Sequence, residues 1–596
     1  MSRLILFVCL VVCVSWPAIA QEVPPKQEFR GAWIATVINL DWPLNPVEPT
    51  DVKKRRMEIL LDGLQAAGVN AVLFQIRSEA DAMYVSETEP WSVWLTGSQG
   101  TPPDPFFDPL AFAIEEAHKR GMELHAWLNP FRVQRAVGSS PTSPDHISNR
   151  RPEWTFTIGG IQVLDPGIPA ARDYVVDVVA EVANNYDVDG IHFDDYFYPY
   201  PPNQITNQDD DTFAEYNRGI TNRGVWRREN IDLFVEAVQD TLLAISPDIN
   251  YGISPFGIWK NGVPPGIVGL DAYSVIYGDA VTWLNEQTID YLAPQLYWAF
   301  GGGQDYGKLA PWWASVANER HLYHGLGAYR TNYSRDEIPR QIRLNRGNDD
   351  IQGQILFRAL NVTGNSLSLR DSLQAEYYRH PALPPTMPWK DMTAPEAPGM
   401  LTFTWDDDEA VLNWDASTEI EGAAASRFYA IYRINAAEEP DYDAAFEDPR
   451  NLLALTDQTT YTDLPVQSEN PYYYTVRAVS ANSIESVRSN EVVLEGRAVD
   501  AEADQPVTAR LVQNYPNPFV GRTTIAFVLD RPATVSLRIY DALGREISTL
   551  LDRADLGVGP HTADWEATGR ALSSGTYFYM LDVDNQRQTG KMTLLR

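Results

Sequence analysis

The chain is nearly free of cysteine and poor in histidine. Only Cys9 and Cys13 occur among its 596 residues, and both lie within the first twenty. Removal of that segment would leave no thiol, which excludes disulfide bonds, cysteine nucleophiles and thiolate metal ligands. Eight histidines scattered along the chain argue against a catalytic zinc site. We therefore expect a functional site with no metal and no cofactor.

Basic residues are also in deficit. The chain has 47 lysines and arginines against 80 aspartates and glutamates, a formal net charge of -33. Nucleic acids bind to basic surfaces, so this balance argues against a nucleic-acid partner and disfavours an anionic membrane. The acidic excess favours solubility and does not identify a substrate.

The first twenty residues lack the apolar length of a membrane span and are predicted to be a signal peptide. Arg3 supplies positive charge, residues 4–14 form a short apolar run, and Ala-Ile-Ala at 18–20 is a small-residue cleavage motif. A membrane anchor is the alternative, but the run is shorter than the roughly 20 residues of a spanning helix. Pro17 also interrupts it. We expect a secreted or cell-surface protein without a transmembrane segment in the mature chain.

Proline clusters divide the rest of the chain. They lie at residues 381–385 and 393–398 and mark a linker. Before the linker, helical and strand patterns alternate, and after it the pattern is that of β-strands alone. The predicted domains are one large domain over residues 21–390 and two all-β sandwich domains over 391–497 and 498–596.

The large domain is predicted to be a (β/α)₈ TIM barrel. Its strands are apolar throughout, which suits parallel strands covered by helices on both faces. A doubly wound open sheet is the alternative, but no glycine-rich phosphate loop follows any strand. The predicted strands are residues 29–37, 71–76, 123–128, 190–193, 250–254, 291–296, 321–326 and 354–360.

Two adjacent carboxylates follow the fourth predicted strand. In a barrel of this kind catalytic groups lie where strands end, and Asp194 and Asp195 stand there among aromatic residues. Glycoside hydrolysis uses one acid to protonate the leaving oxygen and a second carboxylate to stabilise or attack the oxocarbenium-like centre. We predict both aspartates as catalytic. Neighbours on a strand point to opposite faces, so the two aspartates share a site only if the strand has ended before them. The alternative is a structural role, in which one of them caps a turn or binds a structural cation.

Ten further side chains are predicted to bind the substrate, because most follow strands and carry charge, amides or aromatic rings. Asp165 is explained equally well as a turn former. His125 and His192 lie inside strands and are interpreted as core residues, and the acidic run 209–211 as a solvated loop rather than a divalent-ion site. The predicted binding residues are Arg77, Asp81, Asn129, Arg132, Asp165, Tyr196, Tyr198, Gln295, Tyr297 and Trp298.

A series of motifs runs through the large domain. They are FRGAWIATV at 29–37, DWP at 41–43, QIR at 75–77, LNPFR at 128–132, LDPG at 164–167, FDDYFYP at 193–199, WRREN at 226–230, GISPFG at 252–257 and PQLYW at 294–298. Through these motifs residues 27–380 resemble the glycosyl-hydrolase-like ten family. The resemblance implies a (β/α)₈ barrel with glycosidase activity, and relatives suggest N-acetylated glycan strands of the peptidoglycan type as substrate. Position by position, it supports the aspartate pair, with Asp81, Asn129, Asp165, Gln295 and Tyr297 around it.

A weaker similarity connects the fourth strand with family eighteen chitinases. Asp189-Gly190 followed by Asp194 is similar to their motif, in which an aspartate positions the acetamido group of the substrate and a glutamate is the acid. Tyr196 stands at the glutamate position, so the similarity does not assign the acid. One hypothesis is that Asp194 orients an acetamido group while Asp195 protonates the leaving oxygen.

The two C-terminal domains have signatures of their own. Residues 391–497, with Ala394-Pro395, Trp414 and the YYTVRA run at 473–478, resemble a fibronectin type III module. Residues 498–596 resemble a type IX secretion C-terminal sorting domain through NYPNPF at 514–519, TTI at 523–525, IYDALGR at 539–545 and SGTY at 574–577. This second resemblance implies export through an outer-membrane translocon, with the type IX secretion machinery as partner.

The sequence thus predicts a secreted or surface-attached glycoside hydrolase that cleaves a polysaccharide by carboxylate acid/base catalysis at the end of the fourth strand. A non-catalytic glycan-binding or adhesion protein is the main alternative, and a lyase or transglycosylase is another. A lectin needs aromatic and amide groups but has no use for a desolvated acid, so the Asp194–Asp195 pair separates the first two. The sugar and the stereochemical outcome stay open, because carboxyl separations are not readable from a chain.

Overall fold

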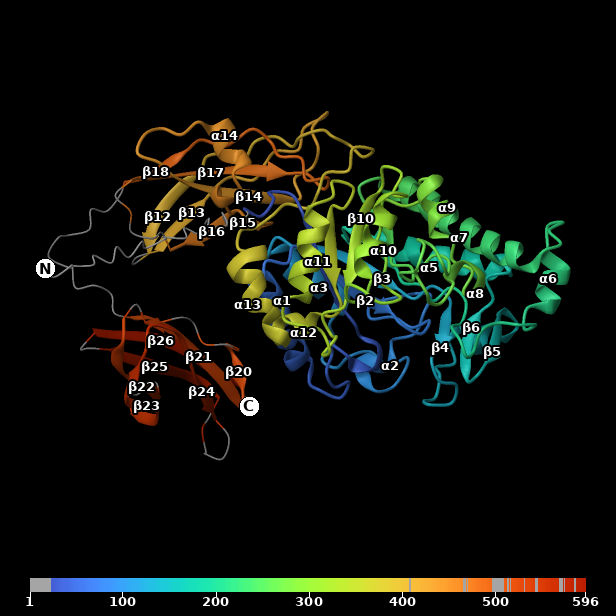
Figure 1. Cartoon of the computed structure of the whole chain (residues 1–596), viewed down its shortest axis with the longest axis horizontal. Helices are drawn as coiled ribbons and strands as arrows, with labels where there is room; N and C mark the ends of the chain where they lie inside the picture. Colours follow the sequence, from blue (N-terminus) through green and yellow to red (C-terminus); the bar gives the residue numbers. More distant parts are fainter. Residues whose placement is uncertain are drawn as a thin grey trace, which may run out of the picture.

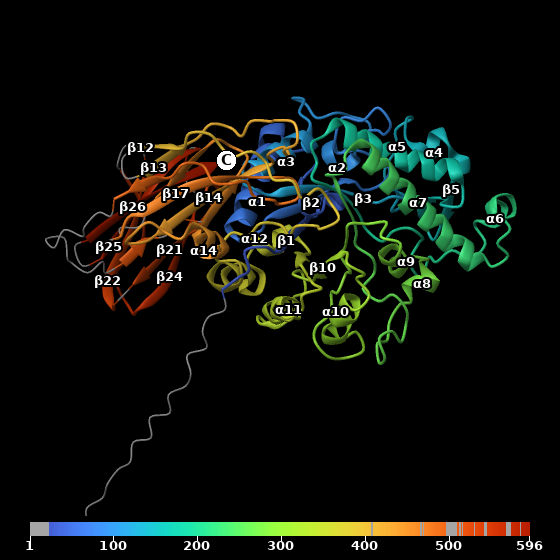
Figure 2. The same cartoon turned by 90° about the horizontal axis from the view of Figure 1, so that it is seen from above.

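The computed structural model of the chain consists of a barrel and two β-rich modules (Figures 1 and 2). It describes residues 23–406, 409–464, 468, 470–495, 509–511, 514, 516–529, 531–541, 545–567, 572, 574–583 and 586–595. The predicted signal peptide, residues 1–20, and parts of the sorting-domain motifs lie outside the described residues. Both views place the β-modules at one end of the molecule and helices α5 to α8 at the other.

Residues 23–390 contain a closed barrel of eight parallel strands, as the sequence predicts. The order around the barrel is β1, β2, β3, β7, β8, β9, β10 and β11, after which β11 pairs with β1 again. Every residue of these strands is buried, because helices cover the outside and side chains fill the inside. The strands are β1 (Phe29–Ile34), β2 (Ala71–Arg77), β3 (Glu123–Leu128), β7 (Gly190–Phe193), β8 (Asn250–Ile253), β9 (Tyr291–Leu292), β10 (His321–Leu326) and β11 (Gly353–Leu356).

The helices of this domain follow the strands in the alternation expected of a barrel. Long helices such as α5 and α7 bury one apolar face against the strands and against each other. The helices are α1 (Thr50–Ala66), α2 (Val93–Thr96), α3 (Pro109–His118), α4 (Ile147–Arg150), α5 (Pro169–Asn185), α6 (Asp210–Tyr216), α7 (Arg223–Ile245), α8 (Ala272–Val275), α9 (Ala280–Asn285), α10 (Tyr306–Ala314), α11 (Glu337–Arg346), α12 (Ala359–Thr363) and α13 (Leu369–Ser372).

Four strands are shorter than predicted, β8 by the single residue Ser254, and one small sheet was not predicted. β1 ends at Ile34, and β11 ends at Leu356 because α12 begins at Ala359. β9 has only two residues because Pro294, which has no N–H group, interrupts its ladder, so that Gln295 pairs only through isolated bridges. The extra antiparallel sheet joins β4 (Arg132–Gln134), β6 (Ile161–Leu164) and β5 (Thr155–Ile158) after β3.

The second module is a two-sheet β-structure. One sheet has the order β12-β13-β16 and the other β15-β14-β17-β18, and their inner faces share an apolar core around Trp414 and Tyr474. This is the sandwich expected from the sequence, and its assignment to the fibronectin type III class stays a prediction. Its elements are β12 (Thr402–Asp406), β13 (Glu409–Asn413), β14 (Phe428–Asn435), α14 (Tyr442–Glu447), β15 (Leu452–Thr456), β16 (Thr460–Asp463), β17 (Tyr472–Val479) and β18 (Val492–Leu494).

The third module is also built from two sheets. Their orders are β19-β21-β24 and β20-β26-β25-β22-β23, around a core that includes Phe527 and Trp565. The strands are β19 (Ala509–Leu511), β20 (Phe519–Val520), β21 (Arg522–Leu529), β22 (Ala533–Asp541), β23 (Glu546–Leu556), β24 (Gly559–Glu566), β25 (Gly575–Val583) and β26 (Gln586–Leu595).

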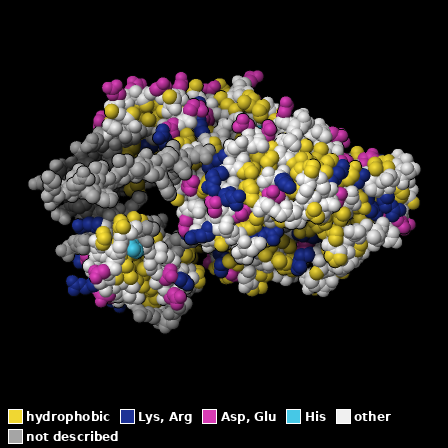
Figure 3. All heavy atoms as spheres, viewed as in Figure 1, with side chains coloured by type: hydrophobic (Ala, Val, Ile, Leu, Met, Phe, Trp, Pro, Cys, Tyr) yellow, Lys and Arg dark blue, Asp and Glu magenta, His cyan; other side chains and the backbone are white. Residues whose placement is uncertain are grey.

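The surface mixes charges of both signs. On the face seen in Figure 3, acidic side chains lie along the outer edge of the second module, and basic ones are interspersed over the barrel. Among the described residues, no helix combines the length and apolar character that crossing a membrane requires.

Candidate active site

The fourth barrel strand ends directly before the two predicted catalytic residues. β7 stops at Phe193, so Asp194 and Asp195 lie beyond the strand and are not forced to opposite faces. Each side chain belongs to a residue that is only 4% exposed. The two carboxyl groups interact electrostatically, since the negative charge of Asp195 disfavours ionisation of Asp194. The structure therefore holds both carboxyl groups in one buried site.

Asp194 is held by the loop after β3. The side-chain amide of Asn129 donates a hydrogen bond to Oδ2 of Asp194, and the backbone N–H of Tyr196 lies 3.5 Å from Oδ1. Burial raises the pKa of Asp194 to about 8, and the charge of Asp195 adds to this rise while Arg132 opposes it. Asp194 is consequently neutral at pH 7.

Asp195 has different partners. The hydroxyl of Tyr200 donates to its Oδ2, and hydrogen bonding from Gln295 also favours its ionised form. Burial raises the pKa of Asp195 to about 6, a smaller rise than at Asp194 because these donors stabilise the charge. The environments of the two neighbours thus separate their pKa values.

Arg132 and Tyr196 flank the pair. Nε of Arg132 donates to the carbonyl oxygen of Ser78 at 2.9 Å, and the guanidinium lies over the ring of Tyr196, 4.7 Å from its centroid. Tyr196 is 41% exposed, so one face of this aromatic side chain is available to a ligand. Burial raises the pKa of Tyr196 to about 12, which keeps its hydroxyl protonated at neutral pH.

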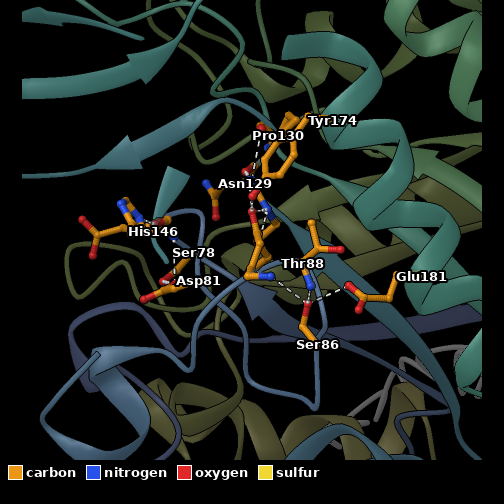
Figure 4. A network of polar contacts seen from close by, with 12 residues as sticks. Ser78, Asp81, Ser86, Thr88, Asn129, Pro130, His146, Tyr174 and Glu181 are labelled. Atoms are coloured by element: carbon orange, nitrogen blue, oxygen red, sulfur yellow. Dashed lines mark hydrogen bonds and ion pairs between the residues drawn. The ribbon is translucent and has the colours of Figure 1, made fainter. Parts of the chain in front are cut away.

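Arg77 contacts the backbone of the loop that carries Asn129. Its fully buried guanidinium forms an ion pair with Glu89 at 2.6 Å and donates to the carbonyl oxygens of Asn129 and Pro130. Figure 4 shows Asn129, Pro130 and Tyr174 meeting in this network, in which the Tyr174 hydroxyl donates to Glu89. These contacts occupy Arg77 within the protein and indicate that it positions Asn129.

Asp81 lies in the neighbouring part of the same loop region. It is fully buried and accepts from the backbone N–H of Glu79 at 3.2 Å, with Ser78 and His146 close by (Figure 4). Burial raises the pKa of Asp81, and the charge of Glu79 adds to the rise. Through Ser78, which also contacts Arg132, Asp81 connects to the aspartate pair indirectly.

The segment after β9 contributes an amide and two aromatic rings. Gln295 donates to the carbonyl oxygen of Ser254 at 2.9 Å, which fixes its amide beside Asp195. Tyr297 packs edge-on against Trp33 and beside Phe357. Burial raises the pKa of its hydroxyl, and the charges of both aspartates add to this rise. The structure brings these residues to the predicted site.

Trp298 belongs to a row of half-buried or exposed aromatic rings. It contacts Phe256 at 5.5 Å between ring centroids, and Phe256 and Tyr196 each contact Tyr200, at 6.1 and 5.6 Å. Sequence reasoning did not select Tyr200 or Phe256. Tyr200 could have been found from the aromatic run that follows the aspartates, whereas Phe256 follows β8 in the GISPFG motif.

Asp165 and Tyr198 form part of a separate cluster. Asp165 accepts from Thr212 and from the backbone N–H of Gly167, and burial raises its pKa to about 6. In the described part of the chain no hydrogen bond joins Asp165 or Tyr198 to the aspartate pair. The charges of Asp209 and Arg227 act on the pKa of both residues.

The structure of the acidic run 209–211 differs in part from the predicted solvated loop. Asp210 and Asp211 are exposed, as a solvated loop requires, but they begin helix α6. Asp209 is fully buried and forms an ion pair with Arg227 at 2.6 Å. The prediction of a solvated loop is therefore wrong for Asp209, because a partner eighteen positions later compensates its charge.

The two strand histidines are core residues, as predicted. His125 and His192 are fully buried, and both contact the hydroxyl of Tyr291, at 2.8 and 3.0 Å. The pKa of His192 is lowered well below its ordinary value by burial, so this side chain is neutral and supplies no charge to the site.

A closed parallel barrel with buried, unequal carboxyl groups at the end of its fourth strand has the architecture of a glycoside-cleaving enzyme. Comparison with known proteins agrees. Residues 28–340 match the model of the family "Glycosyl hydrolase-like 10", and residues 513–594 match the "Secretion system C-terminal sorting domain". The chain belongs to the glycosyl hydrolase-like 10 family and is a glycoside hydrolase, and its sorting domain indicates export from the cell or to its surface.

Relatives named as glycosyl hydrolases cover most of the chain. "Glycosyl hydrolase YngK" of Bacillus subtilis is 37% identical over 505 residues, covering 80% of this chain and 95% of the relative. "Glycosyl hydrolase DigH" of Escherichia coli K12 is 36% identical over 396 residues, covering 59% and 90%. Among solved structures, the glycoside hydrolase domain of PgaB from Bordetella bronchiseptica matches with a TM-score of 0.38 at 14% identity, covering 59% of this chain and 99% of that domain.

Proposed function

We propose that the protein hydrolyses N-acetylated glycan strands of the peptidoglycan type, with Asp194 as the acid and Asp195 as the ionised partner. The observation that carries the division of roles is the separation of the two pKa values, about 8 and about 6. Between these values Asp194 holds a proton and Asp195 does not. Carboxyl groups whose environments push their pKa values apart in this way serve as acid and base.

In this mechanism Asp194 protonates the glycosidic oxygen as the bond to the leaving sugar breaks. Asp195 carries negative charge beside the developing oxocarbenium-like centre and stabilises it, or orients the acetamido group that does so. A water molecule then attacks this centre and gives its proton to the ionised Asp194, which restores the protonated acid. Arg132 lowers the pKa of both carboxyl groups and so limits how far burial can raise them. The roles of the two aspartates are the reverse of the hypothesis based on the chitinase-like motif.

The substrate class is supported by three features of the chain. The fourth-strand motif is similar to one used on N-acetylated sugars, and the amide of Gln295 lies beside Asp195, where it can bind an acetamido group. The exposed face of Tyr196 and the half-buried rings near it offer apolar surfaces on which sugar rings stack.

The test is product analysis by mass spectrometry with the full-length protein. Glycan strands stripped of peptide, intact peptidoglycan and an unacetylated polysaccharide are incubated with the wild type, Asp194→Asn and Asp195→Asn. Asp232→Asn is a matched control, because Asp232 is also a carboxyl group whose pKa burial raises, to about 7, but it hydrogen-bonds Trp283 on the helical side of the barrel.

We expect defined short saccharides from the wild type and the Asp232→Asn control, on peptide-free acetylated strands above all, and none from the two site variants. Cleavage of the unacetylated polysaccharide alone would overturn the substrate class. Tight binding without cleavage by any variant would favour a glycan-binding protein, and retained cleavage by Asp195→Asn would overturn the assignment of the pair.

A further inference from the structure

Gln75, a residue to which sequence reasoning gave no role, connects the segment after the first barrel strand to Asp194, the proposed acid. It lies on β2, is 1% exposed, and uses both ends of its side-chain amide. Its Oε1 accepts from the backbone N–H groups of Thr36 and Val37, each at 3.0 Å. Its Nε2 donates to Oδ1 of Asn129 at 2.7 Å.

The direction of every hydrogen bond in this series follows from the two backbone N–H groups at its start. A backbone N–H can only donate, so the carbonyl end of the Gln75 side chain must face Thr36 and Val37. The NH₂ end of Gln75 then faces Asn129, whose carbonyl must receive it. Asn129 is left with its own NH₂ group toward Asp194, where it donates to Oδ2.

We propose that Gln75 is a positioning residue of the active site, which keeps Asn129 turned with its NH₂ group toward Asp194 so that the acid proton stays on the other carboxyl oxygen. This inference rests on the proposed role of Asp194 as the acid. Oδ2 accepts a short hydrogen bond from Asn129, whereas Oδ1 has only the long contact of 3.5 Å with the backbone N–H of Tyr196. The proton of neutral Asp194 therefore resides on Oδ1 and is available to the glycosidic oxygen.

The opposite orientation of Asn129 would disable the acid. If Asn129 turned its carbonyl toward Asp194, the carboxyl group would donate its proton to that carbonyl instead of to the substrate. The neutral form of Asp194 would also be stabilised by the new bond, and its ionised form would lose the N–H donor, so its pKa would rise. The side chain of Gln75, held by the backbone N–H groups of residues 36 and 37, thereby determines through Asn129 which oxygen of Asp194 carries the proton.

Other groups around Asp194 also act on its pKa. The backbone N–H of Tyr196, which contacts Oδ1, and the side chain of Trp127 favour the ionised form. Arg132 favours the ionised form, and Asp195 disfavours it. The remaining titratable neighbours are tyrosines whose own pKa values burial raises, so they stay neutral over the pH range of interest. They are Tyr196, Tyr200 and Tyr297.

Two substitutions separate this role from a simple packing role. Gln75→Glu keeps the shape of the side chain and accepts from Thr36 and Val37, but its second oxygen can only accept, so Asn129 must turn its NH₂ group toward it. Gln75→Met is uncharged and releases Asn129 without forcing it to turn. Gln354→Met is the control, because Gln354 is an equally buried glutamine on β11 that bonds Tyr378 at 2.7 Å rather than any residue of the site.

Two readouts are measured on the full-length protein. The first is an infrared titration of the protonated carboxyl stretch, in which the signal of Asp194 is identified by its loss in Asp194→Asn. The second is the pH dependence of kcat and KM on peptide-free glycan strands. The infrared titration needs no substrate, so it tests Gln75 even if the wild type cleaves none of the glycans and the proposed function fails.

We expect Gln75→Glu to raise the pKa of Asp194 by about one unit or more and to lower kcat by about tenfold or more with little change in KM. Gln75→Met should shift the pKa in the same direction by less, and Gln354→Met should leave it unchanged. A shift in Gln75→Glu with none in Gln75→Met would assign the effect to the added charge and overturn the proposal. An unchanged pKa in both variants would overturn it as well.

Discussion

The guanidinium of Arg132 lies over the ring of Tyr196, 4.7 Å from the ring centroid. Its charge acts on the carboxyl groups of Asp194 and Asp195, the two residues before Tyr196. Burial raises the pKa of each aspartate, and Arg132 is the positive charge that opposes this at both. The guanidinium thereby keeps the pair in a range where one member can be ionised at neutral pH.

Replacing this charge should move both titrations. Arg132→Met keeps an apolar stem against Tyr196 but removes the cation, so the pKa values of Asp194 and Asp195 should both rise further. In a profile of kcat/KM against pH, both limbs should shift to higher pH, by about one unit. Limbs that stay in place would show that Arg132 does not act on the pair.

The pH profile of the wild type follows from the two pKa values. Activity requires Asp195 to be ionised, so it should fall as the pH drops below about 6. It also requires Asp194 to be protonated, so it should fall as the pH rises above about 8. We predict a bell-shaped profile of kcat/KM with its maximum near pH 7. A maximum below pH 5 would contradict the assignment of both groups.

Tyr200 should control the acid limb of this profile alone. Its hydroxyl donates to Asp195 and lowers the pKa of that carboxyl group. Tyr200→Phe removes the donor and should shift the lower limb to higher pH, while the upper limb stays near its wild-type position. Tyr306→Phe is a control, because the buried Tyr306 hydroxyl donates to Asn345 instead. A shift of the upper limb by Tyr200→Phe would indicate that the roles of the aspartates are exchanged.

The barrel could be predicted because its strands are buried on both faces. A run such as Val72, Leu73 and Phe74 has no polar alternation and is typical of a parallel strand between helices. The sheet of β4, β5 and β6 could not be predicted in the same way, since its strands are three or four residues long and partly exposed. Short antiparallel strands are defined by their pairing, which sequence patterns record weakly.

The place of the aspartate pair beyond the end of β7 could be predicted from the apolar run of that strand, and its catalytic role stays a proposal. The partners of the pair could not be predicted, because they depend on how separate loops meet. Asn129 reaches Asp194 across 65 positions of the sequence, and Gln75 reaches Asn129 across 54. The burial of Asp209 likewise depends on Arg227, which lies on a helix that follows a loop.

The contact between the barrel and the second module yields a prediction about stability. Arg427 forms an ion pair with Asp189 at 3.0 Å, and His118 contacts the other oxygen of Asp189 at 2.8 Å. Burial alone would raise the pKa of Asp189, but the charges of Arg427 and His118 hold it below its ordinary value. A lowered pKa stabilises the fold above the unfolded-state pKa, and this stability is lost as the pH falls through the folded-state value.

Arg427→Met should therefore lower the free energy of unfolding at pH 7 by about 2 kcal/mol, because Asp189 loses a charged partner while keeping His118. The difference from the wild type should shrink as the pH falls below about 4, where the aspartates of the unfolded chain are protonated. Urea unfolding at pH 7 and pH 3 measures it. Arg450→Met, which removes an exposed arginine beside Asp448, should change nothing measurable. Equal effects of the two variants would contradict the prediction.

The most direct test of the division of roles is the cleavage of an aryl glycoside of N-acetylglucosamine units whose phenolate leaves without protonation. Asp194→Asn should retain much of its activity on this substrate while losing it on glycan strands, because an acid is dispensable when the leaving group is good. Asp195→Asn should be inactive on both. Retention of aryl glycoside cleavage by Asp195→Asn, with loss in Asp194→Asn, would contradict the assignment of Asp194 as the acid.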